Sequence, residues 1–249
     1  MRYGICPLSL VPVFEEREQG KMLTQLLYGE LFKILDSRKN HYRIRVQLDK
    51  TEGWIRKDQA AELEEAVWEE TLKSSMGACT QDLFSHIINE EGILFPVAIG
   101  ANAVRASLMD HRFEGDSSIP AKDREHLISQ ALLLLNSPEM PGGRSPLGID
   151  AGGFTQLVYK CCGYALDRNP QQQALQGDAL SFIEESEPGD LAFFDGPDGA
   201  IDHVGIIMKN NYIIHVHGQV RIDRIDHSGI FNTQLRRYTH PLRVIKKLL

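Results

Sequence analysis

The chain has 249 residues, of which 42% are hydrophobic and 24% are charged, and its formal net charge is −7. That length suggests more than one domain, and the apolar fraction is sufficient for a sizeable core, which excludes an intrinsically disordered chain. Positive charge is clustered only among the basic residues between 236 and 247. Because phosphate contact needs a concentrated basic face, we expect no nucleic-acid partner and interpret this cluster as solvated surface.

The chain has four cysteines, Cys6, Cys79, Cys161 and Cys162, without a CxxC or other ligand-like spacing. The sequence therefore indicates neither a zinc site nor a disulfide framework, and we expect no cofactor. The N-terminus has no basic region before a long apolar run, because the apolar stretch at 8–14 is short and contains a proline. We expect no signal peptide and no membrane span, and hence a cytoplasmic protein.

Residues 1–66 have the pattern of a small all-β module. Apolar segments at 22–28, 31–35 and 42–46 are separated by turn residues, and a Gly-Trp-Ile triplet at 53–55 closes the set. Short strands at close spacing, with turn residues between them, are typical of such modules.

Residues 67–122 are predicted to contain a linker and a second, smaller β module. The segment 59–75 is rich in glutamate and helix-prone, which is typical of a solvated linker helix. Apolar segments at 93–100 and 103–106 are predicted to be strands.

Residues 123–249 begin with helices and continue with strands. An apolar face over 127–135 predicts a first helix, and a second begins at Ala151, with apolar residues at helical spacing as far as Cys162. A short third helix begins at Asn169. Five strands are predicted after it, at 179–183, 190–195, 203–208, 212–217 and 220–223. Helices first and an antiparallel sheet second is an α+β layout.

Two histidines lie on neighbouring predicted strands, His203 at the start of one and His215 on the next. Antiparallel neighbours can bring the two rings within reach of each other, and the helix beginning at Ala151 would pack its N-terminus against this sheet. A cysteine at position 151 would complete a Cys-His-His triad, because a helix N-terminus lowers a thiol pKa and presents N–H groups to an oxyanion. Ala151 offers no nucleophile.

The motifs within 142–159, 188–194 and 202–206 resemble the NlpC/P60 family, which has a papain-like fold. The triplet at 53–55 resembles a bacterial SH3 signature, and the segment 220–223 resembles a subgroup of γ-D-glutamyl-diamino acid endopeptidases with N-terminal bacterial SH3 domains. Enzymes of that subgroup cut peptidoglycan stem peptides that carry a free N-terminal L-Ala. The resemblance implies a bacterial SH3-like domain at 1–66, a linker and a second, degenerate SH3-like module at 67–122, and an NlpC/P60 domain at 123–249.

The chain departs from the family at the site itself. The family reads Asp-Cys-Ser-Gly-Phe where this chain has Asp150, Ala151 and Gly152, so the nucleophile and the serine after it are absent. The family's aromatic loop before the Gly-Gly pair is also absent. In the subgroup an acidic residue holds the substrate ammonium, and this chain has the uncharged Asn169 at that position. The resemblance implies substrate-binding positions at Asp150, Gly152, Arg168, Asn169 and Asp202.

Three functions follow from this pattern. Because four features have changed together, we predict a binding or regulatory pseudoenzyme whose ligand is a peptidoglycan-derived or other small peptide, without a metal. One alternative is an active-site Cys-to-Ala form of a murein-peptide hydrolase. A second is a three-His metal site formed by His203, His215 and His217, since residues two apart on a strand share one face.

Overall fold

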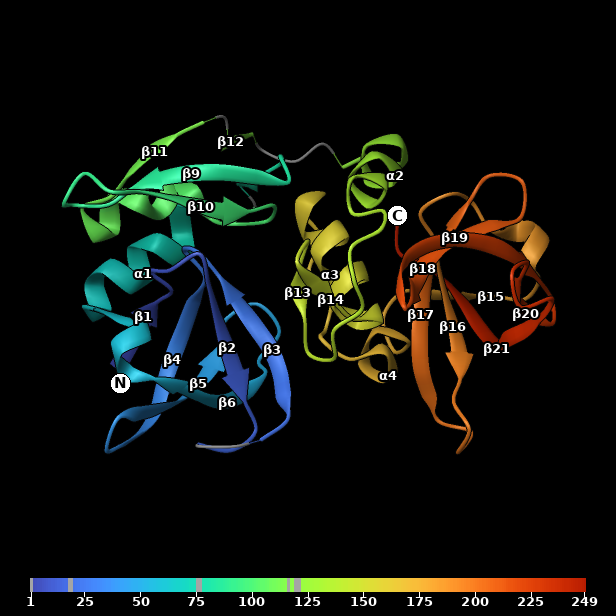
Figure 1. Ribbon diagram of the computed structural model, residues 1–249, viewed down its shortest axis with the longest axis horizontal. Coiled ribbons are helices and arrows are strands. Elements are labelled where there is room, and N and C mark those ends of the chain that lie inside the picture. The colour runs from blue at the N-terminus through green and yellow to red at the C-terminus, as the bar shows by residue number, and fades with distance from the viewer. Residues whose placement is uncertain (1, 18–19, 75–77, 116, 119–121) are drawn as a thin grey trace.

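The computed structural model describes residues 2–17, 20–74, 78–115, 117–118 and 122–249. The remaining residues, some of which belong to the predicted 67–122 unit, lie outside the described residues. Within the described part, no helix is both long and apolar enough to cross a bilayer. Figure 1 shows the first β module and the C-terminal sheet at opposite ends of the molecule, with helices between them.

The first module is a seven-stranded antiparallel sheet with strand order β3-β2-β6-β5-β4-β1-β7. Its strands are β1 (Arg2–Ile5), β2 (Leu10–Phe14), β3 (Met22–Leu27), β4 (Leu31–Arg38), β5 (His41–Val46), β6 (Glu52–Arg56) and β7 (Ala61–Leu63). On β5, Tyr42, Ile44 and Val46 point into the core and alternate with more exposed residues, as a half-buried strand requires. The predicted strands correspond to β3–β6, whereas β1, β2 and β7 were not predicted.

The segment predicted to be a solvated linker helix is packed on the first module instead. Helix α1 (Glu65–Ser74) follows β7, and its Trp68 is only 2% exposed. The Trp68 ring stacks on the Tyr3 ring of β1, with centroids 4.5 Å apart. Burial of this ring, with Leu72 packed beside it and a hydrogen bond from Tyr3 to Glu65, holds an otherwise acidic helix against the sheet.

A smaller unit follows α1. It contains β8 (Cys79–Thr80), β9 (Phe84–Ile88), β10 (Leu94–Ala98), β11 (Arg112–Glu114) and β12 (Ser117–Ser118), arranged as a three-stranded sheet of order β10-β9-β11 and a pair β12-β8. The predicted strand at 103–106 is wrong, because Ala103–Met109 forms a 3-10 helix. Ala103 and Ala106, three residues apart, are its buried positions, which fits one face of such a helix.

The C-terminal unit places helices before a second seven-stranded sheet, as predicted. The helices and the short hairpin between them are α2 (Arg124–Leu133), β13 (Arg144–Ser145), β14 (Gly148–Ile149), α3 (Ala151–Cys161) and α4 (Pro170–Gln173). The strands are β15 (Asp178–Leu180), β16 (Leu191–Asp195), β17 (Ile201–Met208), β18 (Tyr212–His217), β19 (Gln219–Asp226), β20 (Gly229–Asn232) and β21 (Arg237–Lys247). Their order is β15-β21-β16-β17-β18-β19-β20, and β20 also pairs with β21.

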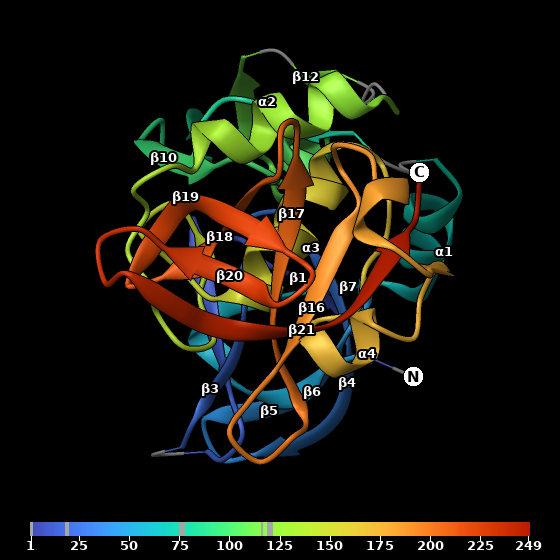
Figure 2. The same ribbon diagram turned by 90° about the vertical axis from the view of Figure 1, so that its right-hand side faces the viewer.

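Helix α3 packs against β17 and β18, so the start of the helix and the centre of the sheet belong to one core (Figures 1 and 2). Strands β20 and β21 were not predicted. The predicted strand at 179–183 is shorter, because Ile183–Glu185 forms a 3-10 helix. The basic residues near the C-terminus lie on β21, where Arg237, Arg243 and Lys247 are exposed, in agreement with a solvated surface.

A buried ionic cluster joins the first module to the C-terminal unit. Glu30 lies between β3 and β4, and its carboxylate contacts the guanidinium of Arg144 and the ammonium of Lys160, the latter at 2.5 Å. The backbone N–H of Leu27 donates to the other oxygen at 3.0 Å. Burial alone would raise the pKa of Glu30, but the two cations outweigh burial and lower it to about 2. The carboxylate is therefore charged, and it fixes two elements of the C-terminal unit against the first module.

We predict that Glu30→Ala destabilises the protein strongly, because it leaves Arg144 as a buried charge without its carboxylate. Breaking a buried ion pair from one side costs about 3–5 kcal/mol. Glu52→Ala is the matched control, since Glu52 pairs with Arg43 and Arg45 on the exposed face of the same module and such pairs contribute about 0–1 kcal/mol. Urea denaturation measures both free energies of unfolding, and equal losses in the two variants would contradict this role of Glu30.

Candidate functional site

The start of α3 is held by the carboxylate of Asp150. As the N-cap, Asp150 accepts a hydrogen bond from the backbone N–H of Gly153 at 2.7 Å, and its second oxygen accepts one from Gly142 at 2.8 Å. The guanidinium of Arg168 binds the same carboxylate with two hydrogen bonds, of 2.8 and 2.7 Å. One side chain therefore fastens the Gly-rich loop, the helix start and the segment before α4 to one another.

Asp150 and Arg168, both predicted as substrate-binding residues, are thus brought together and bound to each other. Arg168 is 3% exposed, and its Nε also donates to Thr24 of the first module at 3.0 Å. The geometry makes this pair the frame of the site, and direct contact of either residue with a ligand stays a prediction.

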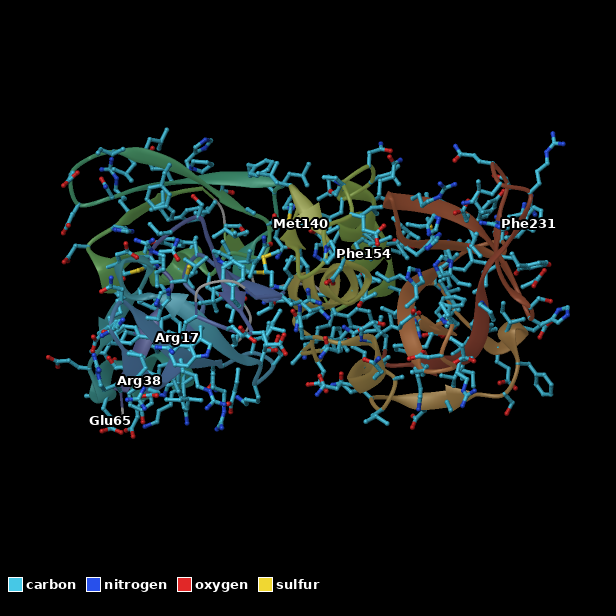
Figure 3. All side chains as sticks on the ribbon, turned by 60° about the horizontal axis from the view of Figure 1, so that its bottom comes forward. Arg17, Arg38, Glu65, Met140, Phe154 and Phe231 are labelled. Carbon is cyan, nitrogen blue, oxygen red and sulfur yellow. The ribbon has the colours of Figure 1, made fainter. Side chains whose placement is uncertain are left out.

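Ala151 and Gly152 form the first turn of α3. Ala151 is 9% exposed. A Cβ added to Gly152 would lie 2.4 Å from the carbonyl oxygen of Arg168 and 3.1 Å from Cδ of Pro170. Position 152 therefore accepts only glycine while the backbone at 168–170 stays where it is. Figure 3 shows Phe154 of α3 and Met140 of the preceding loop in the middle of the molecule, between the first module and the C-terminal sheet.

The structure brings His203 and His215 into direct contact, as predicted from their strands. His203 Nε2 lies 3.0 Å from His215 Nδ1, and both rings are buried. On the far side, His215 Nε2 lies 3.1 Å from Oδ2 of Asp223, a buried residue of β19. Arg221 then donates to both oxygens of Asp223, at 2.7 and 3.0 Å. The result is a continuous chain of four polar side chains.

This chain sets the position of each proton. Burial opposes ionisation of Asp223, but hydrogen bonds from His215 and Arg221 lower its pKa, so the carboxylate only accepts. His215 Nε2 must then carry the proton that Asp223 accepts, which leaves His215 Nδ1 as a lone pair. That lone pair accepts from Nε2–H of His203, so Nδ1 of His203 is unprotonated and available as a base or a ligand.

A third ring completes the cluster. His240 of β21 stacks on His203 with ring centroids 4.0 Å apart and an interplanar angle of 22°. Burial, and then the neighbouring histidines, lower the pKa of His203 well below its usual value. Burial likewise lowers the pKa of His215 although Asp223 opposes the shift, and it lowers that of His240 to about 3. The cluster is therefore neutral near pH 7.

Two predicted positions lie apart from this cluster. Asn169 is exposed at the N-cap of α4, where its side chain makes no cap hydrogen bond and lies 3.4 Å from Gln172. Asp202 precedes His203 on β17 and therefore faces the other side of the strand. Burial, together with repulsion from Asp198, raises the pKa of Asp202. Ligand contact by Asn169 and Asp202 stays a prediction.

Three members of the histidine chain and cluster were not predicted as site residues: Arg221, Asp223 and His240, although the segment 220–223 carried part of the family resemblance. Arg221 and Asp223 lie on the same strand two residues apart, which is a signal that both side chains share one face. The strand register brings these two residues to the histidines, because His215 of β18 pairs with Arg221 of β19. His240 had no such signal, since β21 was not predicted.

We predict that the pKa values of His203 and His215 both lie below the ordinary histidine value, and that both neutral rings carry their proton on Nε2. Because their folded-state pKa values are lowered, the unfolded chain takes up protons as the pH falls through 6.5, so the free energy of unfolding decreases in that direction. Long-range 15N NMR of the imidazoles reads both properties. In Asp223→Asn the carboxylate no longer fixes the proton of His215 on Nε2, so we expect both tautomers of that ring to be populated. A wild-type His215 that carries its proton on Nδ1 would contradict the proposed proton positions.

Comparisons with known sequences agree with this architecture. Residues 140–239 match the NlpC/P60 family, and residues 15–59 match the bacterial dipeptidyl-peptidase Sh3 domain. The chain is 30% identical over 105 residues to the gamma-D-glutamyl-L-lysine dipeptidyl-peptidase of Bacillus cereus, and 32% identical over 93 residues to that of Bacillus subtilis. These matches cover 41% and 36% of this chain, and the chain spans 31% of the length of each relative.

Solved structures extend the similarity to the whole chain. A crystal structure of an NlpC/P60 family protein from Bacillus cereus has a TM-score of 0.78 and 15% identity, and the match covers 98% of this chain and 99% of that chain. NlpC1 from Trichomonas vaginalis has a TM-score of 0.50 and 15% identity, with 99% of this chain and 93% of that chain covered. At these identities the likeness is one of fold. Residues 140–239 therefore match the NlpC/P60 family, residues 15–59 before them match a bacterial dipeptidyl-peptidase Sh3 domain, and the whole chain has the fold of a solved NlpC/P60 family protein.

Proposed function

We propose that this protein binds a peptidoglycan-derived peptide at the start of α3 and does not hydrolyse it. The observation that carries the proposal is an intact frame at the start of α3, a helix that packs on the strands of the two histidines, together with a missing nucleophile. Asp150 and Arg168 hold the helix start, and His203 presents an unprotonated nitrogen, while position 151 is an alanine. The relatives named as gamma-D-glutamyl-L-lysine dipeptidyl-peptidases give the chemical class of the ligand.

The departures from the family motif support one another sterically. The family has a serine where Gly152 stands, and a Cβ there would meet the carbonyl oxygen of Arg168 and the ring of Pro170. Pro170 directly follows Asn169, the residue that replaces the ammonium-binding acid of the subgroup. Two changes that are distant in sequence are therefore packed against each other. The alternative is a single Cys-to-Ala replacement in a murein-peptide hydrolase. That replacement would explain neither the glycine at position 152 nor the asparagine at position 169.

The cysteines that the structure describes offer no substitute nucleophile. All four are buried and free. Burial raises the pKa of Cys6 and Cys162 to about 12, and that of Cys161 is raised well above its usual value by its hydrogen bond with Cys79 and by burial. Cys79 has a lowered pKa through the same hydrogen bond, but it is 0% exposed within the core. A thiol without access to solvent cannot attack a peptide.

We predict that wild-type protein binds L-Ala-γ-D-Glu-diamino acid peptides and releases them uncut. Isothermal titration calorimetry measures the binding, and chromatography of the recovered peptide measures turnover. Asn169→Asp should strengthen binding of the free-amine peptide about 10- to 150-fold, because a charge-assisted hydrogen bond contributes about 1.5–3 kcal/mol.

The N-acetylated peptide is the matched control, since it lacks the ammonium that an acid at position 169 would hold. Its affinity should be the same for both proteins. Hydrolysis of either peptide by wild-type protein would refute the proposal, as would the absence of binding.

A further inference from the structure

The histidine cluster holds more ligand atoms than the base of a peptidase needs. His203, His215 and His240 each offer a ring nitrogen, and these atoms all lie within 4.8 Å of one another. Two of them, Nε2 of His203 and Nδ1 of His215, are 3.0 Å apart. Nitrogens bound to one tetrahedral zinc ion, at about 2.0–2.1 Å each, lie roughly 3.3 Å apart. The spacing of this pair is therefore close to that of two ligands of one metal ion.

The third ring comes from a different strand and has a free nitrogen. His240 lies on β21, where its Nδ1 is 2.9 Å from the hydroxyl oxygen of Thr239. Nε2 is thus the nitrogen that His240 can present to an ion. His240 is half-buried, whereas His203 and His215 are fully enclosed, so rotation of its side chain can close the wider distance. The predicted alternative used His217 as third ligand, and the structure places His240 in that position instead.

The surroundings of His215 are those of a metal-ligating histidine. Such a histidine usually donates its other ring N–H to a carboxylate, which fixes the tautomer and increases the basicity of the ligand nitrogen. Asp223 accepts from Nε2 of His215 at 3.1 Å, and Arg221 holds Asp223 with two hydrogen bonds. This outer group leaves Nδ1 of His215 as a lone pair that faces His203 and His240.

We infer that His203, His215 and His240 form a binding site for a divalent transition-metal ion of the kind that prefers imidazole, with Zn²⁺ as its representative. Binding needs one proton to move within His203, from Nε2 to Nδ1, so that Nε2 can coordinate. The ring stays neutral and no proton leaves the protein. Three neutral imidazoles leave the fourth position of a tetrahedral ion open for water or a ligand carboxylate.

The site shares His203 with the frame of the proposed peptide site, but none of its three ligands belongs to α3 or to the segment 168–170. It also links the two functions of His203. When Nε2 coordinates an ion, Nδ1 carries the proton, so the nitrogen that would act as a base is occupied.

The test is a calorimetric titration of Zn²⁺ into full-length protein that has no His-tag and has been treated with a chelator. We expect one Zn²⁺ per chain. Loss of a residue that only hydrogen-bonds to a metal ligand weakens binding about 10–100-fold, so loss of a ligand itself in His240→Ala should weaken it by at least about 100-fold. Asp223→Asn should weaken it about 10–100-fold. His227→Ala is the control, since His227 is an exposed histidine of the β19–β20 turn and lies outside the cluster.

Zn²⁺ should also raise the Tm of wild-type protein and of His227→Ala, but not that of His240→Ala. His240→Gln preserves most of the side-chain volume and replaces the alanine variant if that variant fails to fold. The absence of one-to-one binding in wild-type protein would overturn the inference. Equal affinity of the His240 and His227 variants would overturn it too, because the ion would then be bound elsewhere.

Discussion

The pairing of an arginine with a carboxylate away from solvent is the interaction on which this structure depends. It occurs at three places that matter for the site: Glu30 with Arg144, Asp150 with Arg168, and Asp223 with Arg221. A charge removed from water is costly unless it is paired and hydrogen-bonded. The first two pairs therefore each hold two segments together, and the third holds the Asp223 carboxylate in place on its own strand. The first pair joins the first module to the C-terminal unit, the second fixes the start of α3, and the third orders the histidines.

The second and third pairs give the site its present character. Asp150 fastens the helix start so firmly to the loop and to Arg168 that Gly152 has no room for a side chain. Asp223 sets the tautomers of two buried histidines and keeps their nitrogens available although no thiol is present to use them. The frame is therefore suited to binding as well as to catalysis. Under our two proposals the ligands are a peptide beside α3 and a metal ion among the histidines.

Elements with local signals could be predicted from the sequence, and elements defined by tertiary contacts could not. The β17–β18 hairpin was found because Asn210 and Asn211 suit its turn, where both have positive φ. Strand β2 was not predicted, and its Pro12 is unusual in a sheet. The structure nevertheless pairs Pro12 with Gln25 of β3, while β2 meets β6 only at Phe14. His203 and His215 were recognised because they lie on adjacent predicted strands. His240 lies on β21, and no local sequence pattern indicates that this strand pairs into the sheet.

The central claim is that the site retains an oriented base beside a helix start that lacks its nucleophile. The most direct test is the alkylation rate of the thiol introduced by Ala151→Cys, measured with iodoacetamide as a function of pH. The account predicts that the helix N-terminus lowers the thiol pKa below the ordinary value of about 8.5, and that His203→Ala slows the alkylation because the nitrogen that accepts the thiol proton is lost. A thiol that titrates near 8.5 in both variants would contradict it.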